Sequence, residues 1–171
     1  MLKKHFDEKR FNREYSQFFP VIFRVAYRIT GDTGSAEDLC HEAFIKYCER
    51  EEMLPDSDQA KYWLIRVVKN LALNHAKRKQ RERHALGKLE KITRPYSESA
   101  EKGLLKAETV SQVQAALAKL PLKLRMVLVL KEYGELNYQQ IGRIMGITEG
   151  NVKVRVFRAR EQLEKLLKDE R

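Results

Sequence analysis

The sequence has little cysteine, proline or glycine: its 171 residues include two Cys, four Pro and eight Gly. Two cysteines cannot build a disulfide framework, and Cys40 and Cys48 would lie roughly 12 Å apart along one helix, too far for a bridge. No apolar run approaches the roughly 20 residues that a membrane-spanning helix needs, and residues 1–7 contain no apolar signal core. We therefore expect a cytoplasmic protein whose two thiols are free and buried.

Basic residues outnumber acidic ones by 34 to 24, which gives a net charge of +10. Such a charge indicates a polyanionic partner, with nucleic acid the first choice and an anionic membrane the second. The charges are also unevenly placed, because residues 32–58 carry nine acids and two bases whereas residues 61–83 carry eight bases and one acid. We expect one surface that repels phosphate and a neighbouring one that attracts it.

Apolar residues recur at helical spacing throughout, and no segment alternates with period two, so the predicted fold is all-α. Gly, Pro and Ser collect between the two periodic parts, which is typical of a linker. We predict two small helical domains, residues 1–84 and 108–171, joined by a flexible linker over residues 85–107.

The first domain is expected to contain three helices. In the first, Pro20 either kinks the helix or marks a fresh start within it. The second is expected to be capped by Ser35, and the third by Ser57 or Asp58. Beyond Lys77 the third helix has no apolar stripe and continues as a basic extension.

Residues 137–160 read as a helix-turn-helix. Asn137 and Gln140 form an N-terminal capping pair, Gly146 ends the short helix, and Thr148 can cap the longer one. On that longer helix the face opposite the buried stripe carries Val154, Phe157 and Arg158. A helix in a DNA major groove needs apolar contacts for thymine methyls and donors for guanine and phosphate. The plainer alternative is a helical hairpin whose cations only keep it soluble.

The third helix offers a second candidate site. Arg66 and Lys69 are predicted to lie opposite the core, and a row of amides and a cation follows one border of that face: Asn70, Asn74 and Lys77. Cations and side-chain amides together suit a single nucleic-acid strand. Trp63 is in phase with the apolar residues and is predicted to lie in the core.

These residues together resemble the extracytoplasmic-function (ECF) sigma factors, the small sigma factors of bacterial RNA polymerase that keep only conserved regions two and four. The resemblance covers residues 11–168 apart from the linker. The matching residues are Tyr27-Arg28, Gly31-Asp32, Ala36-Glu37-Asp38-Leu39, Glu42-Ala43-Phe44, Tyr62-Trp63-Leu64-Ile65-Arg66, Asn70, Leu120-Pro121 and Asn151 to Arg160.

The resemblance implies a promoter-specificity subunit without catalytic residues, cofactor, metal or small-molecule substrate. Its partners would be core RNA polymerase, promoter DNA and an anti-sigma factor. The residues implied in docking on polymerase are Glu37, Asp38, His41, Glu42 and Lys46. Those implied at the melted minus-10 element are Arg66, Lys69, Asn70, Asn74, Lys77 and Arg78, beside a loop over residues 53–60 that captures a flipped base. Those implied at the minus-35 duplex are Asn151, Lys153, Val154, Arg155, Phe157 and Arg158, with Arg160 on phosphate or packed on the domain.

Asn151, Val154 and His41 depart from residues common in the family, so the resemblance does not carry the promoter sequence over. Two alternatives stay open. One is a free-standing helix-turn-helix regulator, which predicts a ligand pocket within residues 1–84 and dimerisation on a palindromic site. The other is a nuclease with Glu37, Asp38 and Glu42 around a metal, although adjacent carboxylates point to different sides of a helix. Cys40, His41 and Cys48 lack a fourth ligand for zinc.

Overall fold

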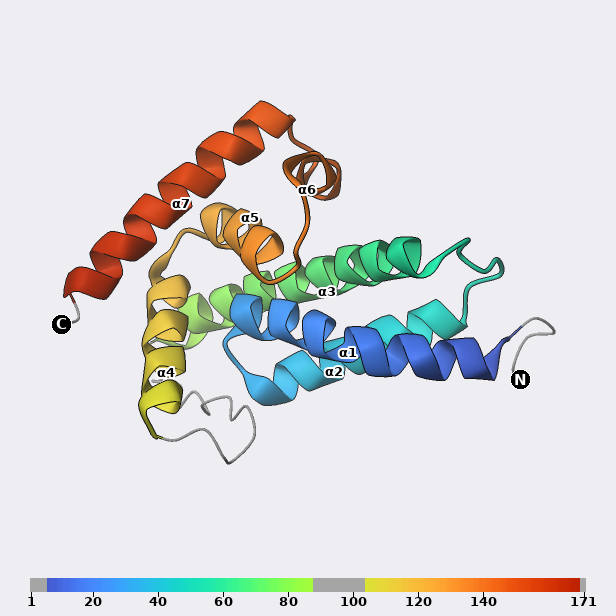
Figure 1. Ribbon diagram of the computed structural model, residues 1–171. Helices are drawn as coiled ribbons and strands as arrows, with labels where there is room; N and C mark the ends of the chain where they lie inside the picture. The colour runs from blue at the N-terminus through green and yellow to red at the C-terminus, as the bar shows by residue number, and fades with distance from the viewer. Residues whose placement is uncertain (1–5, 88–103, 170–171) are drawn as a thin grey trace. The chain divides into compact units, whose positions relative to one another are not determined.

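The computed structural model describes residues 6–87 and 104–169, which form seven helices and no strand (Figure 1). The predicted all-α fold is confirmed. The described residues divide into two compact units, one built from α1 to α3 and the other from α4 to α7. The predicted linker lies mostly outside the described residues, but α3 extends to Leu86 and α4 begins at Leu104, so both of its ends are helical. Within the described ranges no helix has the length and apolar character needed to cross a bilayer.

Helix α1 spans Glu8–Thr30 and continues through Pro20, so no new helix begins there. Helix α2 spans Thr33–Cys48 and starts earlier than predicted, which places Ser35 inside its first turn instead of at its cap. The reason is Gly31, whose φ of 74° turns the chain so abruptly that a new helix can start two residues later.

Helix α3 spans Ser57–Leu86, and its N-cap is Asp56, not Ser57 or Asp58. The Asp56 side chain accepts a hydrogen bond from the backbone N–H of Gln59 at 2.8 Å. A carboxylate at this position satisfies one of the helix's unpaired N–H groups and stabilises the start of α3.

Helices α1 and α3 lie side by side (Figure 1), and α2 adds Ala36, Cys40, Ala43 and Phe44 to the core of the first unit. On α3 the buried stripe is rotated from the predicted one: Ile65, Lys69 and Ala72 are buried, whereas Trp63 and Val67 are only half-buried. The apolar residues of α3 cover a broad arc of the helix. Periodicity identifies such a broad arc but not its centre, which is set by where α1 packs.

The second unit contains α4 (Leu104–Lys119), α5 (Leu122–Glu132), α6 (Tyr138–Met145) and α7 (Glu149–Asp169). Pro121 separates α4 from α5, as predicted. The Arg125 guanidinium of α5 caps the end of α4, because it donates hydrogen bonds to the carbonyls of Ala118 at 2.8 Å and Leu120 at 3.1 Å. Helix α7 packs against the other three, and its Ala159 joins Leu117, Leu120 and Leu128 in a buried cluster.

The helix-turn-helix signals are confirmed in detail. Asn137 and Gln140 form a capping box, Gly146 has a left-handed φ of 68°, and the Thr148 hydroxyl accepts from the Asn151 N–H at 3.2 Å. A Cβ on Gly142 would lie 2.7 Å from the carbonyl oxygen of Ile147. Glycine is therefore required there for the turn to fold back on α6.

Candidate DNA-binding and protein-binding surfaces

Helix α7 presents an apolar and basic face outward. Val152 and Val156 are buried, whereas the Val154 and Phe157 side chains are 48% and 63% exposed. The predicted minus-35 residues share this outer surface: Asn151, Lys153, Val154, Phe157 and Arg158 are exposed, and Arg155 is half-buried. Large apolar side chains left in water beside cations give the face the chemistry needed for both base edges and phosphate.

Tyr138, which the sequence analysis did not select, organises the cations beside that face. The Lys153 ammonium lies 5.9 Å and the Lys131 ammonium 5.0 Å from the centre of its ring. Lys153 also pairs with Glu149 at 3.4 Å. Tyr138 and Glu149 together restrict where the Lys153 charge can lie. The only signal in the sequence was an aromatic residue directly after the capping Asn137.

Arg160 packs on its own domain, which is one of the two roles suggested for it. Its guanidinium donates two hydrogen bonds to one carboxylate oxygen of Glu132, which ties α7 to α5. The pair joins two helices whose paired residues lie 28 positions apart in the sequence.

Helix α3 carries a track of polar and basic side chains. Arg66, Asn70, Asn74 and Arg78 recur every four residues, and Lys77 lies three residues after Asn74. All five side chains are exposed, so they form one strip about 18 Å long. This agrees with the surface predicted for a single strand.

Lys69 corrects that prediction, because its side chain is only 7% exposed and does not lie opposite the core. Its ammonium donates to Asn70 Oδ1 at 2.8 Å. Burial, together with the charges of Arg66 and Lys77, lowers the pKa of Lys69. Lys69 therefore orients the Asn70 amide, and the Asn70 side-chain N–H groups remain to donate to a ligand.

Helix α2 has an outer face that is mainly acidic. Glu37, Asp38, His41, Glu42 and Lys46 are all exposed, as predicted for the docking face. Ile45 lies in the middle of them and is 57% exposed, which the sequence analysis missed. The spacing could have indicated this, because Ile45 follows Glu42 by three residues and His41 by four, and residues so spaced share one face of a helix.

The two cysteines differ in environment. Cys40 is fully buried on the inner side of α2, and burial raises the pKa of its thiol to about 12. Cys48, at the end of α2, is half-buried, and burial raises its pKa as well. Among the residues that the structure describes, no three His, Cys, Asp or Glu side chains gather as metal ligands do, around the acids of α2 or elsewhere.

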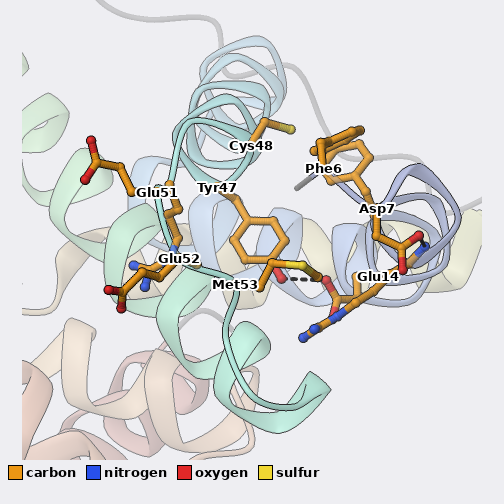
Figure 2. A pocket seen from close by; sticks show the side chains of 11 residues that line it. Phe6, Asp7, Glu14, Tyr47, Cys48, Glu51, Glu52 and Met53 are labelled. Atoms are coloured by element: carbon orange, nitrogen blue, oxygen red, sulfur yellow. Dashed lines mark hydrogen bonds and ion pairs between the residues drawn. The ribbon is translucent and has the colours of Figure 1, made fainter. Parts of the chain in front are cut away.

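An open pocket with a cavity volume of about 70 Å³ lies where the first turns of α1, the last turn of α2 and the following loop meet (Figure 2). Phe6, Phe11 and Tyr47 supply its apolar wall, and Glu51 and Glu52 line it from the loop. A pocket in this domain was expected of a ligand-sensing regulator, so its presence alone does not separate that alternative from a sigma factor.

Comparison with known proteins distinguishes a sigma factor from a free-standing regulator. Residues 15–82 match the Sigma-70 region 2 family and residues 111–163 match the Sigma-70, region 4 family. The ECF RNA polymerase sigma factor SigW of Bacillus subtilis (strain 168) is 32% identical, over 86% of this chain and 83% of SigW. The ECF sigma factor SigL of Mycobacterium tuberculosis (strain H37Rv) is 28% identical over 91% and 87% of the two chains.

Solved structures agree with this. The sigma factor RpoE of Bartonella quintana, determined in complex with the anti-sigma factor NepR, superposes with a TM-score of 0.75. It is 25% identical and the match covers 95% of this chain and 99% of RpoE. CnrH, determined with the cytosolic domain of CnrY, shares the fold with a TM-score of 0.67 at 18% identity. The chain belongs to the ECF sigma factors, the promoter-recognition subunits of RNA polymerase.

Proposed function

We propose that this sigma factor recognises its promoter at two points and attaches to core polymerase at a third. Helix α7 reads the minus-35 duplex, α3 and the loop before it hold the melted minus-10 strand, and the outer face of α2 docks on polymerase. The observation that supports this best is the pair of exposed apolar side chains, Val154 and Phe157, set among cations on the second helix of a helix-turn-helix.

For the minus-35 duplex, Val154 and Phe157 supply apolar contact to thymine methyls, and Lys153 and Arg158 supply donors to guanine or phosphate. Tyr138 and Glu149 restrict the positions open to the Lys153 ammonium before DNA arrives. A side chain that is already ordered loses less conformational entropy when it binds, so this arrangement favours recognition.

For the minus-10 strand, Arg66, Lys77 and Arg78 attract phosphates, while Asn70 and Asn74 offer amides to unpaired bases. Lys69 contributes by orienting Asn70 and not by reaching phosphate. An open single strand presents its base edges to such amides, which a paired duplex does not.

For polymerase, the outer face of α2 offers carboxylates around an apolar centre, Ile45. Acids in this position repel DNA and attract a basic protein surface. A central apolar residue ringed by polar ones is also the usual arrangement of a protein interface.

Since RpoE and CnrH were each determined bound to an anti-sigma factor or a cytosolic domain, we include such an inhibitor among the partners of this chain. We place the action of the sigma factor itself in the cytoplasm, where polymerase meets promoters, and we assign the sigma factor no catalytic reaction of its own.

Charge reversal of the acidic face of α2 tests the docking assignment. The variant E37K/D38K/E42K should lose co-elution with core polymerase while its helical content is unchanged. Its control, E108K/E164K/D169K, makes the same change in net charge at exposed acids of the second unit and should co-elute like the wild type. Unchanged co-elution of the first variant would overturn the assignment.

Neutralising the basic side chains of α7 tests the DNA assignment. The variant K153A/R158A should bind core polymerase normally and lose selection of the minus-35 element, seen as a loss of promoter-specific run-off transcripts. If transcripts continue to start at the same promoters with the same efficiency, α7 does not read the promoter.

A further inference from the structure

A buried carboxylate in α1 is the starting point. Glu14 is only 2% exposed, and a charge so deeply buried is stable only when it is fully paired. One of its oxygens accepts from Arg10 Nε at 2.9 Å and the other from the Tyr47 hydroxyl at 2.6 Å. Figure 2 shows the Tyr47 hydroxyl directed at Glu14, next to Met53. Glu14 therefore links α1 to the last turn of α2.

The same arginine reaches the loop between α2 and α3. Arg10 Nη2 donates to the main-chain carbonyl of Leu54 at 2.7 Å, a bond that joins residues 44 positions apart. Within the loop, Arg50 Nε donates to the carbonyl of Glu52 at 3.3 Å. Asp56 then caps α3. Two arginines thus hold the backbone of a loop that ends at α3, the helix that carries the residues proposed to bind the minus-10 strand.

Apolar packing holds this loop only weakly. Glu51, Glu52 and Met53 are exposed, Leu54 is half-buried, and the open pocket lies behind them (Figure 2). A backbone segment with few buried apolar contacts opens easily unless polar bonds hold it. The bond from Arg10 to Leu54 supplies that restraint.

We propose that Arg10, Glu14 and Tyr47 form a brace that positions the loop over residues 49–56 for capture of the minus-10 strand. They are positioning residues: they set the shape of the loop without touching DNA themselves. This rests on the proposed function of α3 and its loop, and adds α1 to the elements on which minus-10 recognition depends.

The charge arrangement explains the choice of residues. The Arg10 guanidinium pairs with Glu14 through one nitrogen and reaches Leu54 through another, a fork that the single nitrogen of lysine lacks. Burial and the hydrogen bond to Glu14 raise the pKa of Tyr47, so its hydroxyl keeps the proton it donates. The Tyr47 hydroxyl therefore remains a hydrogen-bond donor throughout the physiological pH range.

The decisive variant is Arg10→Lys, which can keep the ion pair with Glu14 but loses the bond to the loop. Holoenzyme made with R10K should bind a single-stranded minus-10 oligonucleotide about tenfold more weakly than wild type. Its discrimination between matched and substituted bases should fall by a similar factor. Its thermal unfolding midpoint and polymerase affinity should stay near the wild-type values. Tyr47→Phe, which removes one hydroxyl, should shift discrimination in the same direction by about threefold.

Arg13→Lys is the matched control, since Arg13 is exposed on the same helix, and it should behave as wild type. The brace is overturned if Y47F, or a folded R10K, discriminates between bases as well as the wild type does. If R10K does not fold, Y47F decides alone. A wild-type holoenzyme that shows no preference among single-stranded sequences would instead contradict the proposed function, and the brace with it.

Discussion

At the scale of single residues, exposure separates side chains that maintain the fold from side chains that act on a partner. Phe157 is 63% exposed, whereas Val156, its neighbour in sequence, is 1% exposed. Removing an exposed side chain usually changes the free energy of unfolding by less than about 0.5 kcal/mol. A large effect on transcription with a small effect on stability would therefore identify Phe157 as a contact residue.

Phe157→Ala is expected to lower promoter-specific transcription about tenfold, because one good base contact contributes about 1–3 kcal/mol. Thermal unfolding should be nearly unchanged. Lys165→Ala, an exposed residue two turns further along α7, is the control and should transcribe normally. Equal transcription by F157A and K165A would remove Phe157 from the promoter contact.

Cys40 makes stability depend on pH in the alkaline range. Its folded pKa of about 12 lies above the ordinary 9.0, so the folded state holds the proton more tightly than the unfolded state. The stability this provides is complete below pH 9 and is lost as pH rises from 9 to 12, at about 1.4 kcal/mol per pH unit. Cys40→Ala lacks this titration.

Urea unfolding followed by the fluorescence of Trp63, the single tryptophan, measures this in the first unit. At pH 7 C40A should be the less stable protein, because it leaves a small cavity. The difference from wild type should shrink as pH rises above 9. A difference that is the same at pH 7 and pH 10.5 would contradict the burial of the thiol.

At the scale of helices, α2 shows how one element serves two environments. Its inner side contributes Ala36, Cys40 and Phe44 to the core, and its outer side exposes Ile45 among acids. The helix is therefore fixed by packing on one side while the other side remains open to a partner.

Ile45→Ser should reduce the affinity for core polymerase about tenfold and leave the unfolding midpoint close to wild type, since an exposed apolar centre contributes to binding and little to folding. Leu86→Ser changes another exposed apolar residue, at the end of α3, and should leave the affinity unaltered. Binding of labelled protein to core polymerase, followed by fluorescence anisotropy, measures both. Equal affinities for the two variants would exclude Ile45 from the interface.

Local signals predicted the helix-turn-helix well, because the capping box at Asn137 and the left-handed Gly146 are determined by nearby residues. The phase of α3 was predicted less well. Its apolar arc is broad, so tertiary packing decides that Lys69 is buried. The bond from Arg10 to Leu54 could not be predicted, since residues 44 positions apart carry no shared pattern before the chain folds. The acidic face of α2 was predicted from charge, but its apolar centre at Ile45 was not.

At the scale of the whole molecule, the two surfaces proposed to bind DNA belong to separate compact units. Joining two modest sites raises overall affinity through effective concentration, but only when both sites can be engaged at once. We expect the free protein to bind duplex DNA weakly, and polymerase to provide the spacing that allows both surfaces to bind one promoter.

Transcription from a randomised promoter library by core polymerase, with and without the purified chain, tests this account most directly. We predict that the chain creates start sites preceded by two preferred sequence blocks at a fixed spacing, the upstream block depending on Lys153 and Arg158 and the downstream block on Asn70. Start sites that are the same with and without the chain, or that show a single block, would contradict it.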